Sequence, residues 1–135
     1  MDPDLLDTPF YREITEYFLA YNNKDIEKVF EICRNDIGAV DVSNDGTVIC
    51  IPDGDDWKMW ALFEIANMNN VGMFMDTEIL DFSGEEHENG TGICFLRYWQ
   101  FFEDDSSKRR FTCIASVFWR YIESKWRIVH WHAAI

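Results

Sequence analysis

The C-terminal half of the chain carries the pattern that most limits its fold. From Gly72 onward, four segments rich in aromatic and β-branched residues are separated by loops with turn residues, which predicts strands at 73–82, 93–103, 111–122 and 126–134. In 93–102 large apolar residues stand at odd and even positions alike, so both faces of that strand are apolar. We therefore expect helices to cover one face of the sheet and a second subunit to cover the other.

The N-terminal half carries helical signals. Thr8 and Pro9 predict the cap and first residue of one helix, and Asp25 can cap a second helix that continues to Cys33. A third helix is predicted from Asp55 to about Asn70. Between the second and third helices, the sequence predicts a hairpin of 37–42 and 47–51 closed by an Asp-Gly turn. These elements predict an α+β fold with three helices in the N-terminal half and an antiparallel sheet.

Length, charge and cysteine spacing limit the function classes. With 135 residues the chain is expected to be one domain, 1–135, and its net charge of -13 argues against binding to nucleic acid or to an anionic membrane surface. The start of the chain lacks the pattern of a signal peptide, and the cysteines match no zinc or redox motif. We expect a cytoplasmic protein without a cofactor or metal, whose free thiols are all buried: Cys33, Cys50, Cys94 and Cys113.

Several segments carry a resemblance to a known superfamily. The order of the elements and the ending Lys125 to His132 resemble the nuclear transport factor 2-like, or SnoaL-like, superfamily. Asn23 to Cys33, Gly54 with Trp57 and Trp60, and Phe95 to Gln100 are most similar to the association domain of calcium/calmodulin-dependent protein kinase II. Where that domain has an acidic residue and an arginine before the tryptophan that matches Trp119, this chain has Ala115 and Val117.

The resemblance implies a cone-shaped, strongly curved sheet. Its concave side, closed by helices, would form a pocket, and its outer side would form a dimer. In some relatives the pocket is the active site of isomerases, dehydratases or polyketide cyclases. In the kinase association domain it is not catalytic and the domain serves oligomerisation. Fold alone therefore leaves the function open.

Arg97 is the first candidate for a binding residue. It stands in an apolar strand between Phe95 and Trp99, its neighbours on the same face, so we expect it to point into the concave pocket. Two roles are open: an internal ion pair with Asp76, Glu78 or another carboxylate, or a pocket arginine that binds a small organic acid.

Other residues could act beside Arg97. His130 and His132 lie two apart on a strand, so they share a face and could be hydrogen-bonded histidines, acid/base groups or, without a third ligand, weak metal ligands. A buried Asp76 or Asp41 could act as a base, although alternating carboxylates also mark a solvated strand face. The candidate ligand-binding residues are Arg97, Trp99, His130, His132, Asp76 and Trp57.

Two function classes follow. We favour a non-catalytic domain that forms homodimers or larger homo-oligomers and binds a small molecule in a concave pocket. The alternative is a small-molecule enzyme of the isomerase, dehydratase or polyketide-cyclase type. The sequence contains no complete catalytic set, no glycine-rich phosphate loop and no nucleophile elbow.

Overall fold

A computed structural model describes residues 5–42, 48–51 and 54–134, with the backbone alone for 34–42, 48–51, 54–58, 60 and 61. The chain forms, in order, α1 (Tyr11–Asn22), α2 (Ile26–Ile32), β1 (Cys33–Val42), β2 (Val48–Ile51), α3 (Gly54–Asn70), β3 (Phe74–Glu86), β4 (Thr91–Glu103), β5 (Lys108–Ile122) and β6 (Lys125–Ala134). The predicted α+β class, the three helices and the strands of the C-terminal half are confirmed.

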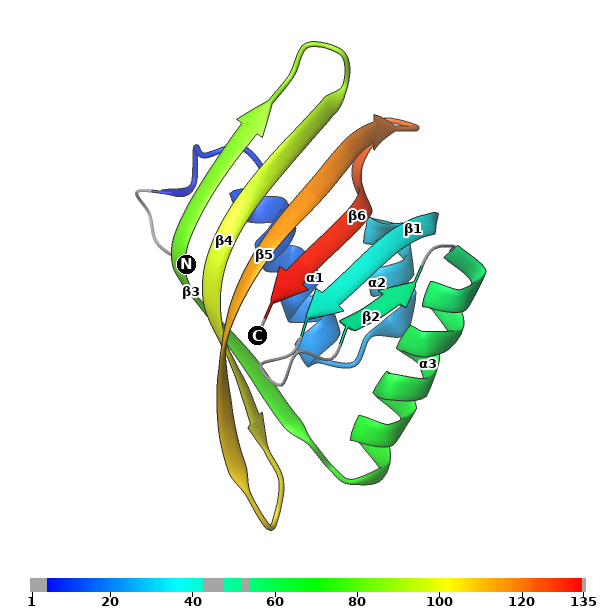
Figure 1. The fold of residues 1–135 in the computed structure, drawn as a ribbon, viewed down its shortest axis with the longest axis vertical. Helices are drawn as coiled ribbons and strands as arrows, with labels where there is room; N and C mark the ends of the chain where they lie inside the picture. Colours follow the sequence, from blue (N-terminus) through cyan, green and yellow to red (C-terminus); the bar gives the residue numbers. More distant parts are fainter. Residues whose placement is uncertain (1–4, 43–47, 52–53, 135) are drawn as a thin grey trace.

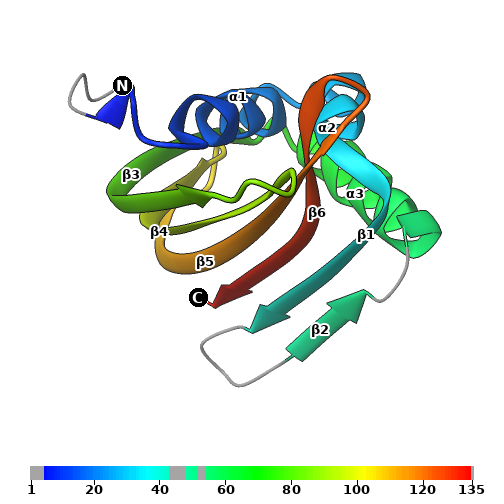
Figure 2. The same cartoon turned by 90° about the horizontal axis from the view of Figure 1, so that it is seen from above.

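The strands form a six-stranded sheet in the order β2-β1-β6-β5-β4-β3. Neighbouring strands are antiparallel, as predicted, except that β1 runs parallel to β6. Nothing in the strand spacing predicts this parallel pair. Figure 1 and Figure 2 show that the sheet curls around α1, which lies on its concave side, while α3 stands at one edge beside β1 and β2. The Asp-Gly turn predicted between β1 and β2 lies outside the described residues.

The first helix begins later than the sequence predicts. Thr8 and Pro9 lie in a turn, and α1 starts at Tyr11 after Phe10, whose φ is 72° and which makes no side-chain cap. A positive φ is uncommon for a residue with a large side chain and needs compensation. The ring of Phe10 supplies it by stacking on Trp119 at 5.2 Å and meeting Trp126 edge-on at 4.9 Å.

The second helix follows its prediction closely. The Asp25 carboxylate accepts a hydrogen bond from the backbone N–H of Lys28 at 3.2 Å, so Asp25 is the N-cap. The helix ends at Ile32, and Cys33 already belongs to β1. The prediction that the helix includes Cys33 is wrong by one residue, because the chain turns directly from helix into strand.

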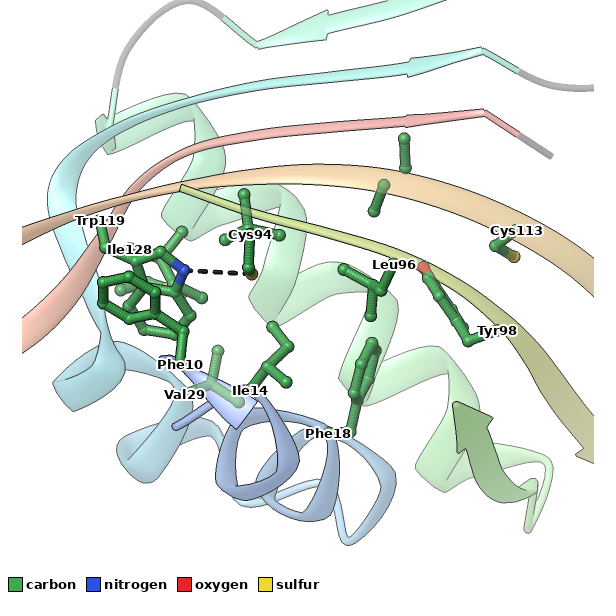
Figure 3. Packing of buried hydrophobic residues seen from close by; sticks show 14 of the residues in the cluster. Phe10, Ile14, Phe18, Val29, Cys94, Leu96, Tyr98, Cys113, Trp119 and Ile128 are labelled. Carbon is green, nitrogen blue, oxygen red and sulfur yellow. Dashed lines mark hydrogen bonds between the residues drawn. The ribbon is translucent and has the colours of Figure 1, made fainter. Parts of the chain in front are cut away.

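The main core lies between α1 and the inner, concave face of β4, β5 and β6 (Figure 3). Small residues on this face let α1 approach closely. At Gly92 an added methyl group would overlap the Phe10 ring, and at Gly84 it would overlap the backbone of Pro9. The largest fully buried side chains of the described residues are those of Trp119, Ile14, Ile128, Val29, Val117, Cys33 and Cys94.

Three of the four thiols match their prediction. Cys33, Cys94 and Cys113 are buried thiols outside any disulfide, while the side chain of Cys50 lies outside the described residues. The indole N–H of Trp119 donates to the sulfur of Cys94 at 3.3 Å. Burial raises the pKa of Cys94 to about 12 and raises that of Cys33 as well, so both stay protonated and inert at neutral pH.

Candidate functional site

Arg97 lies on the outer face of the sheet. On β4 the buried residues Leu96 and Tyr98 face the helices, so Arg97 between them faces away. Its side chain is 50% exposed, and its Nη2 lies 2.6 Å from Oδ2 of Asp81, to which its Nε also donates at 2.8 Å. The prediction that Arg97 points into the concave side is therefore wrong. Arg97 does pair with a carboxylate, that of Asp81, but the pair lies exposed on the outer face, so the prediction of an internal ion pair is wrong in its burial.

The strand register gathers apolar side chains around Arg97 on this outer face. Arg97 stands opposite Ile114 of β5, and Phe95 stands opposite Ser116. Phe95 is 50% exposed, Ile114 60% and Phe118 39%. We call the residues Phe95, Ile114 and Phe118 the outer apolar patch. It is a cluster of large apolar side chains that water covers in the isolated chain.

The two histidines share this face. Ser116 pairs with His132 and Phe118 pairs with His130, so the predicted common orientation is confirmed. His130 is half-buried, with its ring 5.5 Å from that of Phe118, and His132 is exposed. Among the described residues no group of three or more His, Cys, Asp or Glu side chains is placed to hold a metal ion.

Asp76 and Trp99 lie on the same face but near its other end. Asp76 is exposed and accepts a hydrogen bond from the backbone N–H of Thr77 at 2.9 Å. The guanidinium carbon of Arg110 lies 4.1 Å from the centre of a Trp99 ring. β3 and β6 are separated by β4 and β5, about 14 Å at the usual strand spacing, and the two residues also lie at different levels along the sheet: Asp76 at that of Arg110 on β5, His132 at that of Ser116. These two residues therefore do not form an acid/base pair.

Trp57 and Asp41 stay untested as site residues. Trp57 belongs to α3, and Asp41 belongs to β1 opposite Ala133, but their side chains lie outside the described part of the structure. Of the six residues predicted to bind a ligand, the structure thus brings five onto one sheet face. That face is the outer one rather than the concave one.

Two hollows adjoin the outer face. One, of about 320 Å³, surrounds the Arg97 and Asp81 pair and is lined also by Ser83, Phe95 and Ile114. The other, of about 500 Å³, lies where β3 begins and the β4–β5 hairpin turns, between Phe74, Asp76, Phe101 and Lys108 among others. Each is lined largely by exposed and half-buried side chains, so a small molecule there would keep much of its surface in water.

A polar cluster on the inner face was missed by the sequence analysis. Asn22 Nδ2 donates to Thr77 Oγ1 at 2.9 Å, Thr77 Oγ1 donates to Gln100 Oε1 at 2.5 Å, and Gln100 Nε2 donates to Asn22 Oδ1 at 3.0 Å. The buried Gln100 is thus held in a closed ring that ties the end of α1 to β3 and β4. The sequence signal was an amide at the same alternation as the buried Leu96 and Tyr98.

No protein-family model and no curated protein matches the chain. Its architecture belongs to the α+β class in which a strongly curved sheet wraps a helix, and solved structures share it over nearly the whole chain. A nuclear transport factor 2-like protein of unknown function from Pseudomonas putida matches with a TM-score of 0.70 at 13% identity, over 91% of this chain and 81% of that one.

Two further structures have established names. The association domain of calcium/calmodulin-dependent protein kinase II from C. elegans matches with a TM-score of 0.66 at 14% identity, over 92% of this chain and 91% of that domain. The β subunit of benzoate 1,2-dioxygenase from Burkholderia mallei matches with a TM-score of 0.73 at 11% identity, over 90% and 84% of the two chains. The chain therefore has the nuclear transport factor 2-like fold, and identities this low establish the fold alone. No helix in the described residues is long and apolar enough to cross a membrane.

Proposed function

We propose that the chain is a non-catalytic assembly domain that forms homodimers through the outer face of its sheet. The outer apolar patch carries this proposal: three large side chains, between 39% and 60% exposed, lie on the same face of the neighbouring strands β4 and β5. Contact with a second protein surface removes apolar area of this kind from water, and that removal is favourable. A partner with the same patch provides a matching surface about a two-fold axis.

Charge on the outer face supports a second copy as the partner. Arg97 is already paired with Asp81, so bringing this surface into an interface buries a neutral pair rather than a lone charge. The other charged groups of the strongly acidic chain would repel a second copy over most of the surface. An association domain among the structures of the same fold is consistent with this use.

Sedimentation of the chain at micromolar concentration tests the proposal. We expect a particle of at least twice the 16.0 kDa of one chain. Phe95→Glu places a charge in the outer apolar patch and should abolish that contact. Leu19→Glu is the matched control, since Leu19 is 62% exposed on α1 and lies outside the patch. A wild-type particle of 16 kDa would overturn the proposal.

Binding of a small organic acid is a second part of the proposal. The exposed guanidinium of Arg97, with a hollow of about 320 Å³ beside it, supports it, although an anion would have to compete with Asp81. Titration calorimetry of small carboxylates against the wild type, Arg97→Ala and Arg97→Lys tests this part. A heat of binding that is unchanged in Arg97→Ala would exclude Arg97 as the residue that binds the acid.

The enzyme alternative depends on His130 and His132 together with a nearby carboxylate. The distance between Asp76 and His132 removes one such pair. Asp41 stands opposite Ala133, and strand alternation puts that position on the other sheet face from His132, so the register does not pair these two residues either. A His132→Ala variant that loses turnover of a carbonyl or hydroxy-acid substrate while keeping its assembly state would favour this alternative.

A further inference from the structure

Helix α3 carries apolar side chains on two opposite sides. Ile65 and Met68 are buried against the rest of the molecule. On the other side Met59 is 71% exposed, Leu62 49% and Phe63 65%, and Ala66 is exposed as well. These four positions follow the i, i+3, i+4, i+7 spacing of one helix face. We call Met59, Leu62, Phe63 and Ala66 the α3 stripe.

The α3 stripe is separate from the outer apolar patch. The patch lies on β4 and β5, in the middle of the sheet, whereas α3 stands at the edge of the molecule beside β1 and β2 (Figures 1 and 2). A helix that is apolar on both sides is normally covered on both sides. One chain therefore presents two apolar surfaces, and a single two-fold contact through the sheet leaves the α3 stripe open.

We propose that the α3 stripe packs antiparallel against the α3 stripe of another copy and joins two sheet-face dimers into a closed tetramer. This inference rests on the proposed function, because it takes the sheet-face dimer as its building block. It names a second contact that the dimer does not use. A dimer presents two α3 stripes, so a closed tetramer contains two identical helix pairs.

The order of side chains along α3 makes the stripe complementary to itself. With a two-fold axis between Leu62 and Phe63, antiparallel pairing sets Leu62 of one helix opposite Phe63 of the other. The same pairing sets Met59, at the large end, opposite Ala66, at the small end. The two large residues Leu62 and Phe63 then fill the centre of the contact, and at each end the large Met59 meets the small Ala66, which lets the helices pack closely. A parallel pairing would set each large residue against its own copy.

The charges of α3 also select the antiparallel pairing. The helix has acidic positions at its start, Asp55 and Asp56, and amides at its end, Asn69 and Asn70. Antiparallel pairing sets acidic positions opposite amides, whereas parallel pairing would set four carboxylates together at one end. From Met59 to Asn70 the helix contains a single charged residue, Glu64, in a chain with a net charge of -13. Interfaces are depleted of charge in the same way and enriched in Met and Phe.

The size of the contact argues for a tetramer over a dimer held by α3 alone. The stripe spans 59–66, only about 12 Å of helix, and one such pair buries far less than the roughly 800 Å² per partner of a stable interface. Two pairs formed together between preassembled dimers strengthen each other by raising the effective concentration. The tetramer should therefore form only when the sheet-face dimer is intact.

Sedimentation velocity of four chains tests the inference. We expect a wild-type particle four times the 16.0 kDa chain, a dimer for Phe63→Glu, a tetramer for the control Leu19→Glu, and a monomer for Phe95→Glu. Phe63 and Leu19 are 65% and 62% exposed, so the two substitutions disturb the folded chain equally little. A wild type that stays dimeric overturns the α3 contact and leaves the proposed function standing. A wild-type monomer overturns both, and open filaments overturn the closed tetramer.

A cysteine placed next to the proposed two-fold axis gives an independent readout. Oxidised Leu62→Cys should form covalent dimers, whereas Glu16→Cys, exposed on α1, should not. The wild-type chain treated in parallel reports any reaction of the native thiols. Cross-linking of Leu62→Cys that is no faster than that of Glu16→Cys would show that the stripes do not meet, and would leave a different protein as the partner of α3.

Discussion

Phe118 and Trp119 are neighbours on β5 and face opposite sides of the sheet. Trp119 is 1% exposed, stacks on Phe10 and donates to Cys94, whereas Phe118 is 39% exposed and touches the ring of His130. Both are large aromatic residues, so hydrophobicity does not distinguish the two faces. The difference lies in what covers each face: α1 covers the inner face within the chain, whereas the cover of the outer face is, in our proposal, a second chain.

Removing one large side chain from the inner face, and in a separate variant one from the outer face, should give the largest difference in stability. Trp119→Ala should lower the free energy of unfolding by about 3–5 kcal/mol, since it opens a cavity in a fully packed core. Phe118→Ala should lower it by under about 1 kcal/mol in a chain kept monomeric by Phe95→Glu. Urea unfolding followed by fluorescence and circular dichroism measures both. Equal losses would mean that the outer face contributes to the fold of the single chain.

Adding side-chain volume on the inner face should lower the free energy of unfolding by somewhat less than Trp119→Ala does. Gly92→Ala pushes a methyl group into the Phe10 ring and should lower stability by about 1–3 kcal/mol. Combining it with Phe10→Leu should recover part of that loss, because the smaller side chain leaves room. Urea unfolding of the two single variants and the double variant gives the coupling. Strict additivity would contradict the contact between these residues.

The hydrogen-bonded ring of Asn22, Thr77 and Gln100 on the inner face should contribute more to the free energy of unfolding than a typical exposed contact. Asn22→Ala removes one donor and one acceptor from the closed ring and leaves the buried amide of Gln100 short of a partner. We expect a loss of about 1–3 kcal/mol. Asn23→Ala is the control next along the chain. A change below 0.5 kcal/mol, as for an ordinary surface substitution, would show that water replaces the lost partner.

The ion pair of the outer face should contribute less. Arg97 and Asp81 are 50% and 69% exposed, so Arg97→Ala in the monomeric Phe95→Glu chain should cost about 0–1 kcal/mol and less in high salt. A double-mutant cycle with Asp81→Asn isolates the pair. The expectation for a buried Arg97 would be about 3 kcal/mol or more, and measuring that value would contradict the outer placement.

The smallest effect at neutral pH is expected for the reaction of the inner-face thiols with a reagent in the folded chain. Cys33, Cys94 and Cys113 should react with a thiol reagent only as the chain unfolds, whereas an added Ser83→Cys on the exposed part of β3 should react at once. Fast reaction of more than one of the four wild-type thiols in native buffer would contradict this burial.

Alkaline pH turns the same burial into a loss of stability. The Cys94 pKa is about 12 in the folded chain and about 9 when unfolded, so above pH 9 the unfolded state binds fewer protons. Stability should fall as pH rises from about 9 to 12, and Cys94→Ala should reduce this slope.

The sequence predicts the elements well, because their signals are local. The Asp25 cap, the apolar spacing of the helices and the turn residues between strands each act within a few residues. The predicted start of α1 was wrong because Phe10 adopts a left-handed conformation in which its ring packs on Trp119 and Trp126. These two residues lie far along the chain. Local cap statistics contain no information on such a partner.

The main wrong prediction placed the candidate site on the concave face of the sheet, and this error has a physical cause. Phe95 and Trp99 flank Arg97, and their size indicates burial on the same side. The helix-facing alternation instead holds smaller residues beside α1, such as Gly92, Cys94 and Ala115, since a helix needs room to approach a sheet. At the positions beside α1, small side-chain volume therefore indicates the inner face, although Tyr98 and Trp119 show that large residues also face inward.

The contact of Phe10 with Trp119, Trp126 and Gly92 also determines when α1 can fold during synthesis. Phe10 leaves the ribosome before every strand that it touches, because its partners belong to β4, β5 and β6. Until those strands emerge, the apolar side of α1 has no cover, and such surfaces are the ones that chaperones bind. A nascent chain stopped after β3 should therefore stay open to protease around Phe10, and protection should arrive only with β6.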